Sequence, residues 1–473
     1  DVAPAASIFA YKVYDDEDVV KENQQIVIHQ LRVKDIELAF LAALDDAERE
    51  GVQIINLSLS NWILEYSPED DPLMQRVEEL VQRGITVVCT AGNKNSPFCT
   101  QSCIGEPGNS PHVITVGATT ADGVRVAPYS SRGPVRNTFE IKPDVVAPGS
   151  YFNLYTSSVE EGTSYAAPYV SGSIALIKQK IPRWGPYEMK SALASTAIQL
   201  RDGDEVISPI AQGSGLINVR DALFSFTMFS PVHLSIHMNE MSAISSKKLE
   251  ITNLSKQEEI YDLKYTSDDL EGNRYIDITL PGKITLPGEA KEEVPLIAEL
   301  ISIIGLPPAT DLQGSGTIHI TTSEQRWHVP LLIGLSTPPI IELNGFNFKK
   351  KTLTLRVNYN KVFLVIKLGR IVNGQPVLMN EVRYPIPKGE QTMNIQDSTT
   401  QLMNTLFKKS AGRELIPIDS EFIIGISAEI QGTEWKQYIG SYNFYFRSGQ
   451  VQFQEHHFQE IKQPTIPRIE YPS

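Results

Sequence analysis

Up to about residue 222, the chain alternates short β-branched runs with amphipathic helical runs, a pattern typical of parallel βα units. The runs Ser7–Val13 and Val52–Ser60 are expected to form buried strands, and Asp35–Glu50 between them places its apolar side chains on one helical face. Further strands are expected at Thr86–Thr90, Val113–Ala118 and Asp144–Ala147, with helices at Pro72–Arg83, Thr163–Lys180 and Pro186–Ala197. Residues 1–222 are therefore predicted to form an α/β domain with a doubly wound parallel sheet.

Helical periodicity is lost beyond this point, and short alternating segments separated by turn residues follow. The expected strands include Lys248–Thr252, Ile276–Leu280, Gly316–Thr321, Trp327–Leu332, Leu353–Tyr359, Val362–Leu368, Phe422–Ile430 and Ser441–Phe446. Such a series is typical of antiparallel sandwiches, and the pair Pro338-Pro339 marks a break within it. We therefore predict two all-β sandwich domains, at residues 223–337 and 338–473, the second ending in a proline-spaced tail at Gln463–Ser473.

The charge and hydropathy of the chain exclude two classes of partner. Its 42 Lys and Arg residues against 56 Asp and Glu residues give a net charge of −14, so nothing favours binding to nucleic acid. The most apolar stretch, Val294–Leu306, contains Pro295 and Glu299 and is too short for a membrane span, which needs about 20 residues. Neither a nucleic-acid partner nor insertion into a membrane is expected.

The segment Gly162–Gly172 is the most informative stretch for function, because it places Ser164 at the start of an apolar helix. Gly162 permits close approach of the backbone, and the unpaired amide groups and dipole of a helix N-terminus favour a developing negative charge. This environment suits a nucleophile beside half of an oxyanion hole. Taken alone, however, Thr163 or Ser164 is more often only the cap of a buried helix. The residues on either side of Thr163 and Ser164 favour the interpretation as a nucleophile over that as a helix cap.

The segment matches every fixed position of Gly-Thr-Ser-x-Ala-x-Pro-x-Val-x-Gly, and the chain thereby resembles the subtilisin-like serine peptidases, or subtilases. Other blocks agree with this family in order and spacing, namely Val2-Ala3-Pro4 with Tyr11-Lys12-Val13, Ile54–Leu59, Ala91-Gly92-Asn93, Val113–Ala118, Ser130–Pro134 and Lys142–Gly149. Ile210–Val219 resembles the end of the catalytic domain in large extracellular and cell-envelope subtilases. The resemblance covers about residues 1–222 and implies a subtilisin-like fold there.

The resemblance assigns roles to the matching residues. It makes Ser164 the attacking hydroxyl and Asn93 the side-chain donor to the oxyanion, although Asn93 alone would read as a turn residue that tolerates positive φ. It makes Ser58-Leu59-Ser60 the strand that pairs with the substrate backbone, and Ala91-Gly92 part of the pocket for the residue before the cut. Ser60-Asn61 stands where many relatives carry glycine, so Ser60 is expected to narrow the cleft.

The residues that would activate Ser164 are missing from the sequence. Subtilases carry their aspartate in Asp-Thr-Gly or Asp-Ser-Gly and their histidine in His-Gly-Thr-His, and neither string occurs here. His29 lies on the wrong side of Val2-Ala3-Pro4 and lacks the glycine. The remaining histidines read as ordinary core or surface residues, namely His112, His233, His237, His319, His328, His456 and His457. We therefore expect an N-terminally truncated subtilase whose sheet is incomplete at its N-terminal side and which has no peptidase turnover alone.

Other polar and sulfur-containing residues receive no catalytic role. Asp144 lies in a matched block that forms a structural strand in the family, so it is not assigned as the acid of the triad. Cys99 and Cys103 are equally compatible with a small disulfide and with two free thiols, while Cys89 is expected to be buried in its strand. No metal-ligand spacing is present, and the calcium that often accompanies the family cannot be placed from the sequence.

Together these features predict a serine endopeptidase that hydrolyses protein or peptide substrates through an acyl-enzyme on Ser164 and requires no cofactor. The resemblance implies an extracellular or cell-envelope location. The two sandwich domains look like the fibronectin-type modules of large subtilases, which implies stabilisation, spacing, or docking to a substrate or cell surface. The alternative is a non-catalytic subtilase-like binding or adhesion protein, against which the intact residues around Ser164 and Asn93 argue.

Overall fold

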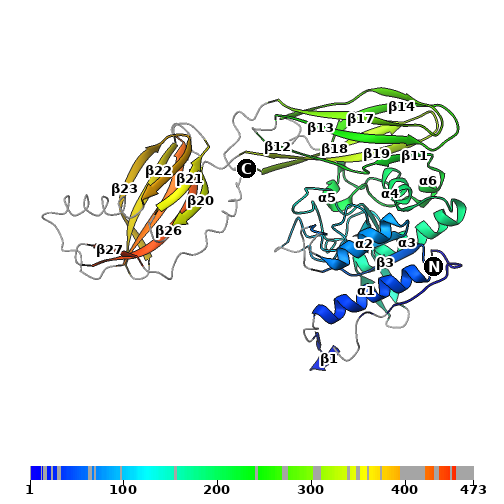
Figure 1. Ribbon diagram of the computed structural model, residues 1–473, viewed down its shortest axis with the longest axis horizontal. Coiled ribbons are helices and arrows are strands. Elements are labelled where there is room, and N and C mark those ends of the chain that lie inside the picture. Colours follow the sequence, from blue (N-terminus) through cyan, green and yellow to red (C-terminus); the bar gives the residue numbers. More distant parts are fainter. Residues whose placement is uncertain are drawn as a thin grey trace. The chain divides into compact units, whose positions relative to one another are not determined.

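The computed structural model of the protein describes residues 2–11, 13, 19–22, 25–28, 33–61, 66–68, 71–95, 99–153, 157–239, 243–268, 275–301, 311–337, 341–347, 352–358, 362–372, 375–394, 421–430, 436–447 and 450–453. The chain divides into two compact units, residues 1–302 with 312–335 and residues 303–311 with 336–473 (Figure 1). The first unit contains the candidate site.

The first unit is built on a four-stranded parallel sheet. Its strands lie in the order β3 (Ile54–Leu57), β4 (Thr86–Thr90), β5 (Ile114–Thr119) and β6 (Val145–Pro148). The helices that pack against it are α1 (Val33–Arg49), α2 (Pro72–Gln82), α3 (Thr163–Lys180) and α4 (Pro186–Ser195). The parallel α/β sheet predicted from the sequence is confirmed.

The two faces of this sheet carry separate apolar cores. On one face, buried side chains of α1 and α2, namely Phe40, Leu44, Val77 and Leu80, pack on Val87 of the sheet. On the other face, α3 and α4 contribute Ala166, Val170, Ile174, Met189 and Leu193, which pack on Val88, Val116 and Val145. Helices therefore cover both faces, which explains why the strands of the sheet are apolar almost throughout (Figure 1).

Capping explains why α2 begins where the sequence predicts. Asp71 is its N-cap, and Asp71 Oδ1 accepts hydrogen bonds from the backbone N–H groups of Leu73 at 2.7 Å and Met74 at 3.0 Å. Pro72 occupies the first helical position, where the N–H that proline lacks would have no partner inside the helix. The dipeptide Asp71-Pro72 thus fixes the start of the helix.

The predicted strand Ser7–Val13 is wrong for the residues that the structure describes. Residues 7–11 form no regular element, and the side chains of Ile8, Phe9 and Tyr11 are exposed. A β-branched run becomes a strand only where a neighbouring strand takes its hydrogen bonds, and among the described residues β3 pairs with β4 alone. A short unpredicted hairpin follows, made of β1 (Val19–Glu22) and β2 (Gln25–Ile28).

Shorter elements complete the α/β part of the first unit. The hairpin of β7 (Ser150–Asn153) and β8 (Ser158–Glu161) lies between β6 and α3. The others are β9 (Arg201–Asp202), β10 (Glu205–Val206), α5 (Pro209–Gln212) and α6 (Val219–Phe224). No helix in the described part of the chain is both long enough and apolar enough to cross a membrane.

Two β sheets follow α6 in the first unit. One sheet has the strand order β11 (Thr227–Ser230), β13 (Ile244–Asn253), β17 (Lys291–Leu300) and β15 (Ile276–Thr279). The other has the order β12 (Leu234–Met238), β19 (Arg326–Ser336), β18 (Asp311–Thr321), β14 (Glu259–Ser267) and β16 (Lys283–Leu286). Trp327 of β19 packs on Phe229 of β11 with ring centroids 5.9 Å apart, so the sheets face each other as a sandwich.

The second unit is also made of β strands. Three of them pair in the order β20 (Ile341–Asn347), β21 (Thr352–Val357) and β24 (Gly389–Asn394). Five more pair in the order β23 (Gln375–Ile386), β22 (Val362–Val372), β25 (Glu421–Ile430), β26 (Lys436–Arg447) and β27 (Gln450–Phe453). The C-terminal half of the chain is therefore mostly β structure, as predicted. The domain boundaries at residues 222 and 337 stay predictions. Pro338-Pro339 and the tail at Gln463–Ser473 lie outside the described residues.

Candidate active site

Ser164 lies in the first turn of α3, preceded by the N-cap Gly162. The Ser164 side chain is half-buried, so its hydroxyl is within reach of a substrate. A Cβ atom on Gly162 would lie only 3.3 Å from Nδ2 of Asn93, which shows how closely the backbone passes this side chain. Because residue 162 is a glycine and has no Cβ atom, Asn93 can approach the start of the helix closely.

Ser58 and Ser164 hold each other in place through two hydrogen bonds. Ser164 Oγ donates to the backbone oxygen of Ser58 at 3.2 Å, and Ser58 Oγ donates to the backbone oxygen of Ser164 at 3.0 Å. Ser58 follows the last residue of β3 directly, so the sheet fixes the position of the predicted nucleophile. The sequence places Ser58 in the substrate strand but gives no signal for this reciprocal pair.

The orientation of the Asn93 amide follows from its contact with Thr163. Asn93 Oδ1 accepts from the backbone N–H of Thr163 at 3.0 Å and from Thr163 Oγ1 at 2.8 Å. A backbone N–H can only donate, so the atom facing it must be the amide oxygen. Nδ2 is then the end of the amide that lies beside Gly162, where it can donate to an oxyanion. Thr90 Oγ1 donates in turn to Thr163 Oγ1, which ties this arrangement to the end of β4.

The other predicted substrate-binding residues lie around the same point. Leu59 and Ser60 continue from Ser58 after β3, while Ala91 and Gly92 follow β4 and are buried. The carboxyl ends of adjacent parallel strands thus bring all these segments together with the N-terminus of α3, a common position for binding sites in α/β folds.

The histidines that the structure describes have partners other than the predicted nucleophile. Among them, no histidine is hydrogen-bonded to Ser164. His112 Nε2 lies 3.6 Å from Glu78 Oε2, and His319 Nε2 lies 2.9 Å from Thr266 Oγ1. His29, His456 and His457 lie outside the described residues.

Asp144 lies at the centre of a buried group of charges, as suits a structural residue. Its carboxylate is 2.7 Å from Lys142 Nζ and 2.9 Å from Lys190 Nζ, and it accepts from the backbone N–H of Thr115 at 2.7 Å. Burial opposes its ionisation, but the two ammonium groups outweigh this effect and hold the pKa of Asp144 well below its usual range. Asp144 therefore neutralises buried lysines.

A second serine and histidine lie beside this aspartate. Ser214 Oγ is 3.0 Å from His233 Nε2, and His233 Nδ1 is 3.7 Å from Asp144 Oδ1. Burial lowers the pKa of His233 to about 3, so its ring is neutral at ordinary pH. Ser214 has an exposed fraction of 0%, so no peptide can reach its hydroxyl. The group joins the α/β part to the first sandwich and is not a second active site.

Comparison with known proteins identifies the group of proteins to which this arrangement belongs. Residues 1–216 match the family model described as the subtilase family. The subtilisin of Bacillus pumilus is 33% identical over 225 residues, which are 47% of this chain and 69% of that subtilisin. The chain belongs to the subtilase family.

Two further relatives come from Bacillus subtilis (strain 168). The minor extracellular protease Vpr is 36% identical over 135 residues, which are 26% of this chain and 17% of Vpr. The serine protease AprX is 34% identical over 204 residues, which are 38% of this chain and 44% of AprX. The chain thus spans less than half the length of each of these two relatives. Subtilases are serine endopeptidases as a family, and the matched region holds Ser58, Asn93 and Ser164.

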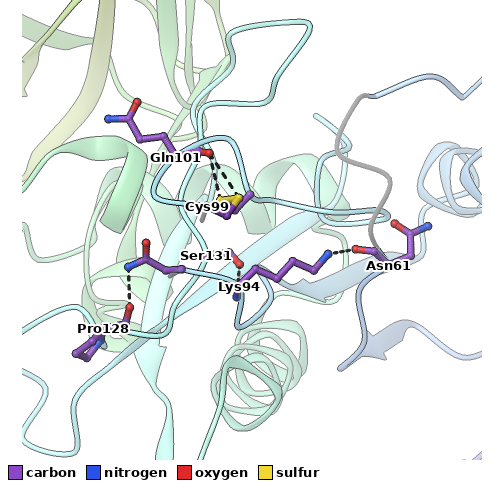
Figure 2. The surroundings of a disulfide bond; sticks show 8 residues. Asn61, Lys94, Cys99, Gln101, Pro128 and Ser131 are labelled. Carbon is purple, nitrogen blue, oxygen red and sulfur yellow. Dashed lines mark hydrogen bonds between the residues drawn. A yellow bond between two sulfur atoms is a disulfide. The ribbon is translucent and has the colours of Figure 1, made fainter. Parts of the chain in front are cut away.

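Two of the three cysteines of this subtilase are bridged. Cys99 and Cys103 form a disulfide (Figure 2), and Cys89 is a buried free thiol in β4. The sequence could not decide between a bridge and two thiols, because the choice depends on the path of the loop. The bridge lies in the loop that follows Asn93 and precedes Gly105.

No metal site is found in the part of the subtilase that the structure describes. There, no three His, Cys, Asp or Glu side chains form a group that could hold an ion. Two residues of the acidic run Glu69-Asp70-Asp71 lie outside the described residues. The expectations for calcium and for cofactors stay untested.

A buried carboxyl beside Asn61 leads to a prediction about stability. Burial, reinforced by the nearby Asp71 carboxylate, raises the pKa of Glu106 to about 7 from 4.5. A raised carboxyl pKa stabilises the fold at low pH, and this contribution is lost as the pH rises through 7. Glu106→Gln keeps an acceptor for Asn61 Nδ2 but cannot ionise. Its free energy of unfolding, relative to that of wild type, should therefore be about 1–2 kcal/mol higher at pH 8 than at pH 4.5.

Urea unfolding of both proteins at the two pH values measures this difference. Glu324→Gln, which removes an equal charge at an exposed turn, serves as the control and should show no such pH dependence. An equal gain of Glu106→Gln over wild type at both pH values would show that Glu106 is ionised normally.

Proposed function

We propose that this subtilase chain provides the nucleophile and the oxyanion hole of a serine endopeptidase, and that the aspartate and histidine of the triad come from a segment outside the 473 residues. The observation that carries the proposal is the convergence of Ser164 and Asn93 on the N-terminus of α3. Asn93 is oriented by Thr163, and Ser164 is oriented by Ser58. No aspartate or histidine of the family motifs occurs in the sequence.

The proposed reaction proceeds in two steps. The histidine takes the proton of Ser164 Oγ as the oxygen attacks the peptide carbonyl, and it then gives that proton to the leaving amine. The tetrahedral oxyanion accepts hydrogen bonds from Asn93 Nδ2 and from the backbone N–H of Ser164. Water then attacks the acyl-enzyme by the same route and releases the acid product with free Ser164. No cofactor takes part in either step.

The location and the β domains belong to the same proposal. One relative is named an extracellular protease, and a disulfide persists in oxidising surroundings, so we place the protein outside the cell or in its envelope. The β part of the chain is proposed to form fibronectin-like sandwiches at residues 223–337 and 338–473. Their proposed role is to dock a protein substrate or a cell surface.

The alternative is a non-catalytic subtilase-like binding or adhesion protein. Reading the coding sequence upstream of Asp1 separates the two, because the peptidase requires Asp-Thr-Gly and His-Gly-Thr-His motifs there. The upstream segment, joined to the chain, gives what we call the complemented enzyme. It should hydrolyse a protein substrate such as casein, whereas the 473-residue chain alone should not. Absence of both motifs, with no hydrolysis by the gene product, would favour the binding protein.

Removal of the proposed oxyanion donor should slow the reaction with little effect on substrate affinity. In the complemented enzyme, Asn93→Ala is expected to lower kcat by about 10²–10³-fold. Asn93→Asp keeps the acceptor for Thr163 but loses the Nδ2 donor, so it should lose a similar factor. Asn95→Ala is the matched control, because Asn95 Nδ2 bonds the Pro128 oxygen at 2.6 Å instead. Peptide hydrolysis at saturating substrate measures all three, and a kcat for Asn93→Ala within about threefold of wild type would refute the role.

A further inference from the structure

Ala91-Gly92 is predicted to line the pocket for the substrate residue before the cut, and other side chains of the protein lie close to Gly92. Ser60 Oγ lies between two glycines from different loops. A Cβ atom on Gly105 would be 2.7 Å from Ser60 Oγ, and one on Gly92 would be 3.5 Å from the same atom. Gly92 is next to Asn93, and Ser60 is two residues from Ser58, so this space borders the nucleophile. The Ser60 hydroxyl therefore fills the gap between the two loops.

Behind Ser60, the two walls of this space are in direct contact. A Cβ atom on Gly105 would be 2.2 Å from the backbone oxygen of Asn61, closer than any side chain tolerates. Asn61 N donates to the Glu106 oxygen at 3.0 Å, and Glu106 N donates to Asn61 Oδ1 at 3.1 Å. Asn61 Nδ2 also donates to Glu106 Oε2 at 3.1 Å. Backbone atoms and three hydrogen bonds, not a mobile side-chain tip, close the pocket.

The loop that carries Gly105 is itself anchored on its far side. The Cys99–Cys103 disulfide precedes Gly105, and Cys103 N donates to the Arg132 oxygen at 2.8 Å. Lys94 N donates to Ser131 Oγ at 3.0 Å, and the Lys94 ammonium reaches across to the Asn61 oxygen (Figure 2). Movement of the Gly105 loop away from Asn61 would break the three hydrogen bonds between Asn61 and Glu106 together, so the closed state is the stable one.

We propose that this pocket admits only a small side chain, so that the protein cleaves after glycine, alanine or serine. The inference rests on the proposed peptidase function and adds the substrate class. Asn61, Ser60 and Gly105 set the limit. A side chain larger than serine would have to displace backbone, and a site of fixed volume rejects such substrates by about 10²-fold or more in kcat/KM. The Lys94 ammonium contacts the wall, so it is not expected to select an acidic residue.

The test uses the complemented enzyme with peptides that differ only in the residue before the cut. Peptides with alanine, serine or glycine before the cut should react. Peptides with phenylalanine, lysine or aspartate there should have a kcat/KM that is lower by a factor of about 10² or more. Ser60→Gly alone leaves the backbone walls in place and should change little, whereas Ser60→Gly with Asn61→Gly also removes the two side-chain hydrogen bonds to Glu106 and should raise the ratio of phenylalanine to alanine turnover by at least about tenfold. Ser246→Gly, on the exposed face of β13, is the control and should leave this ratio unchanged.

A fluorophosphonate without a side chain separates failure of this inference from failure of the proposed function. If the probe labels Ser164 and the phenylalanine and alanine peptides are hydrolysed equally fast, the small pocket is wrong but the proposed peptidase function is supported. Faster turnover of the aspartate peptide overturns it in favour of a carboxylate site at Lys94. Absence of labelling and of all turnover overturns both proposals.

Discussion

Ser164→Ala in the complemented enzyme is expected to lower kcat by about 10⁴–10⁶-fold, the largest effect of any single substitution in the chain. The loss has a chemical cause, because alanine has no oxygen that could attack the peptide carbonyl. The half-buried Ser164 side chain makes one hydrogen bond, to the Ser58 oxygen, so its removal should cost little stability. Peptide hydrolysis and thermal unfolding of the same preparations measure both effects.

Ser58→Ala is the informative comparison for this prediction. It removes the hydrogen bond that Ser58 Oγ donates to the Ser164 backbone but leaves the nucleophile and the Ser58 carbonyl in place. A decrease of only about tenfold is expected, since a positioning contact is lost and no reacting atom. If Ser58→Ala and Ser164→Ala lowered kcat by equal factors, Ser164 would act only by maintaining the structure. That result would contradict its role as nucleophile.

Asp144→Ala should produce the largest loss of stability, about 3–5 kcal/mol in the free energy of unfolding. The carboxylate is the buried partner of Lys142 and Lys190, whose side chains have exposed fractions of 1% and 9%. Its removal leaves two ammonium groups in an apolar interior without an anion, and the backbone N–H of Thr115 loses its acceptor. Urea unfolding of the 473-residue chain, followed by the signal of its α/β part, measures the change.

Asp144→Asn separates charge from hydrogen bonding at this position. The asparagine can still accept from Thr115 but cannot neutralise the lysines, so it should destabilise the chain nearly as much as alanine does. Asp204→Ala removes an acidic side chain from the exposed turn between β9 and β10 and should change stability by less than about 0.5 kcal/mol. A loss below about 1 kcal/mol for both Asp144 variants would show that the lysines are neutral or solvated.

The sequence was sufficient for the four long helices α1–α4, the four parallel strands and the start of the helix that carries Ser164, because these depend on local periodicity and caps. Asp71-Pro72 and Gly162-Thr163 act within a few residues of themselves. The strand at Ser7–Val13 failed because a strand requires a partner, and a run of apolar residues does not specify one. The side chains of Ile8, Phe9 and Tyr11 are exposed instead.

The contacts that shape the site join residues far apart in the chain, and no pattern in the sequence reports them. Asn61 and Glu106 are 45 residues apart, and Ser58 and Ser164 are 106 apart. The departure at Ser60-Asn61 was visible from the family resemblance, which predicted a narrower cleft. The structure adds that Asn61 holds the walls together, because only the folded chain brings Gly105 and Glu106 beside it.

Locating the site of covalent modification tests the central claim most directly. The complemented enzyme is treated with a fluorophosphonate, digested, and analysed by mass spectrometry for the modified residue. We predict one phosphonylated serine, Ser164, no adduct on Ser58 or Ser214, and no adduct in the 473-residue chain alone, which lacks the activating histidine. An adduct confined to another residue, or equal labelling of wild type and Ser164→Ala, would contradict the assignment of Ser164 as the nucleophile.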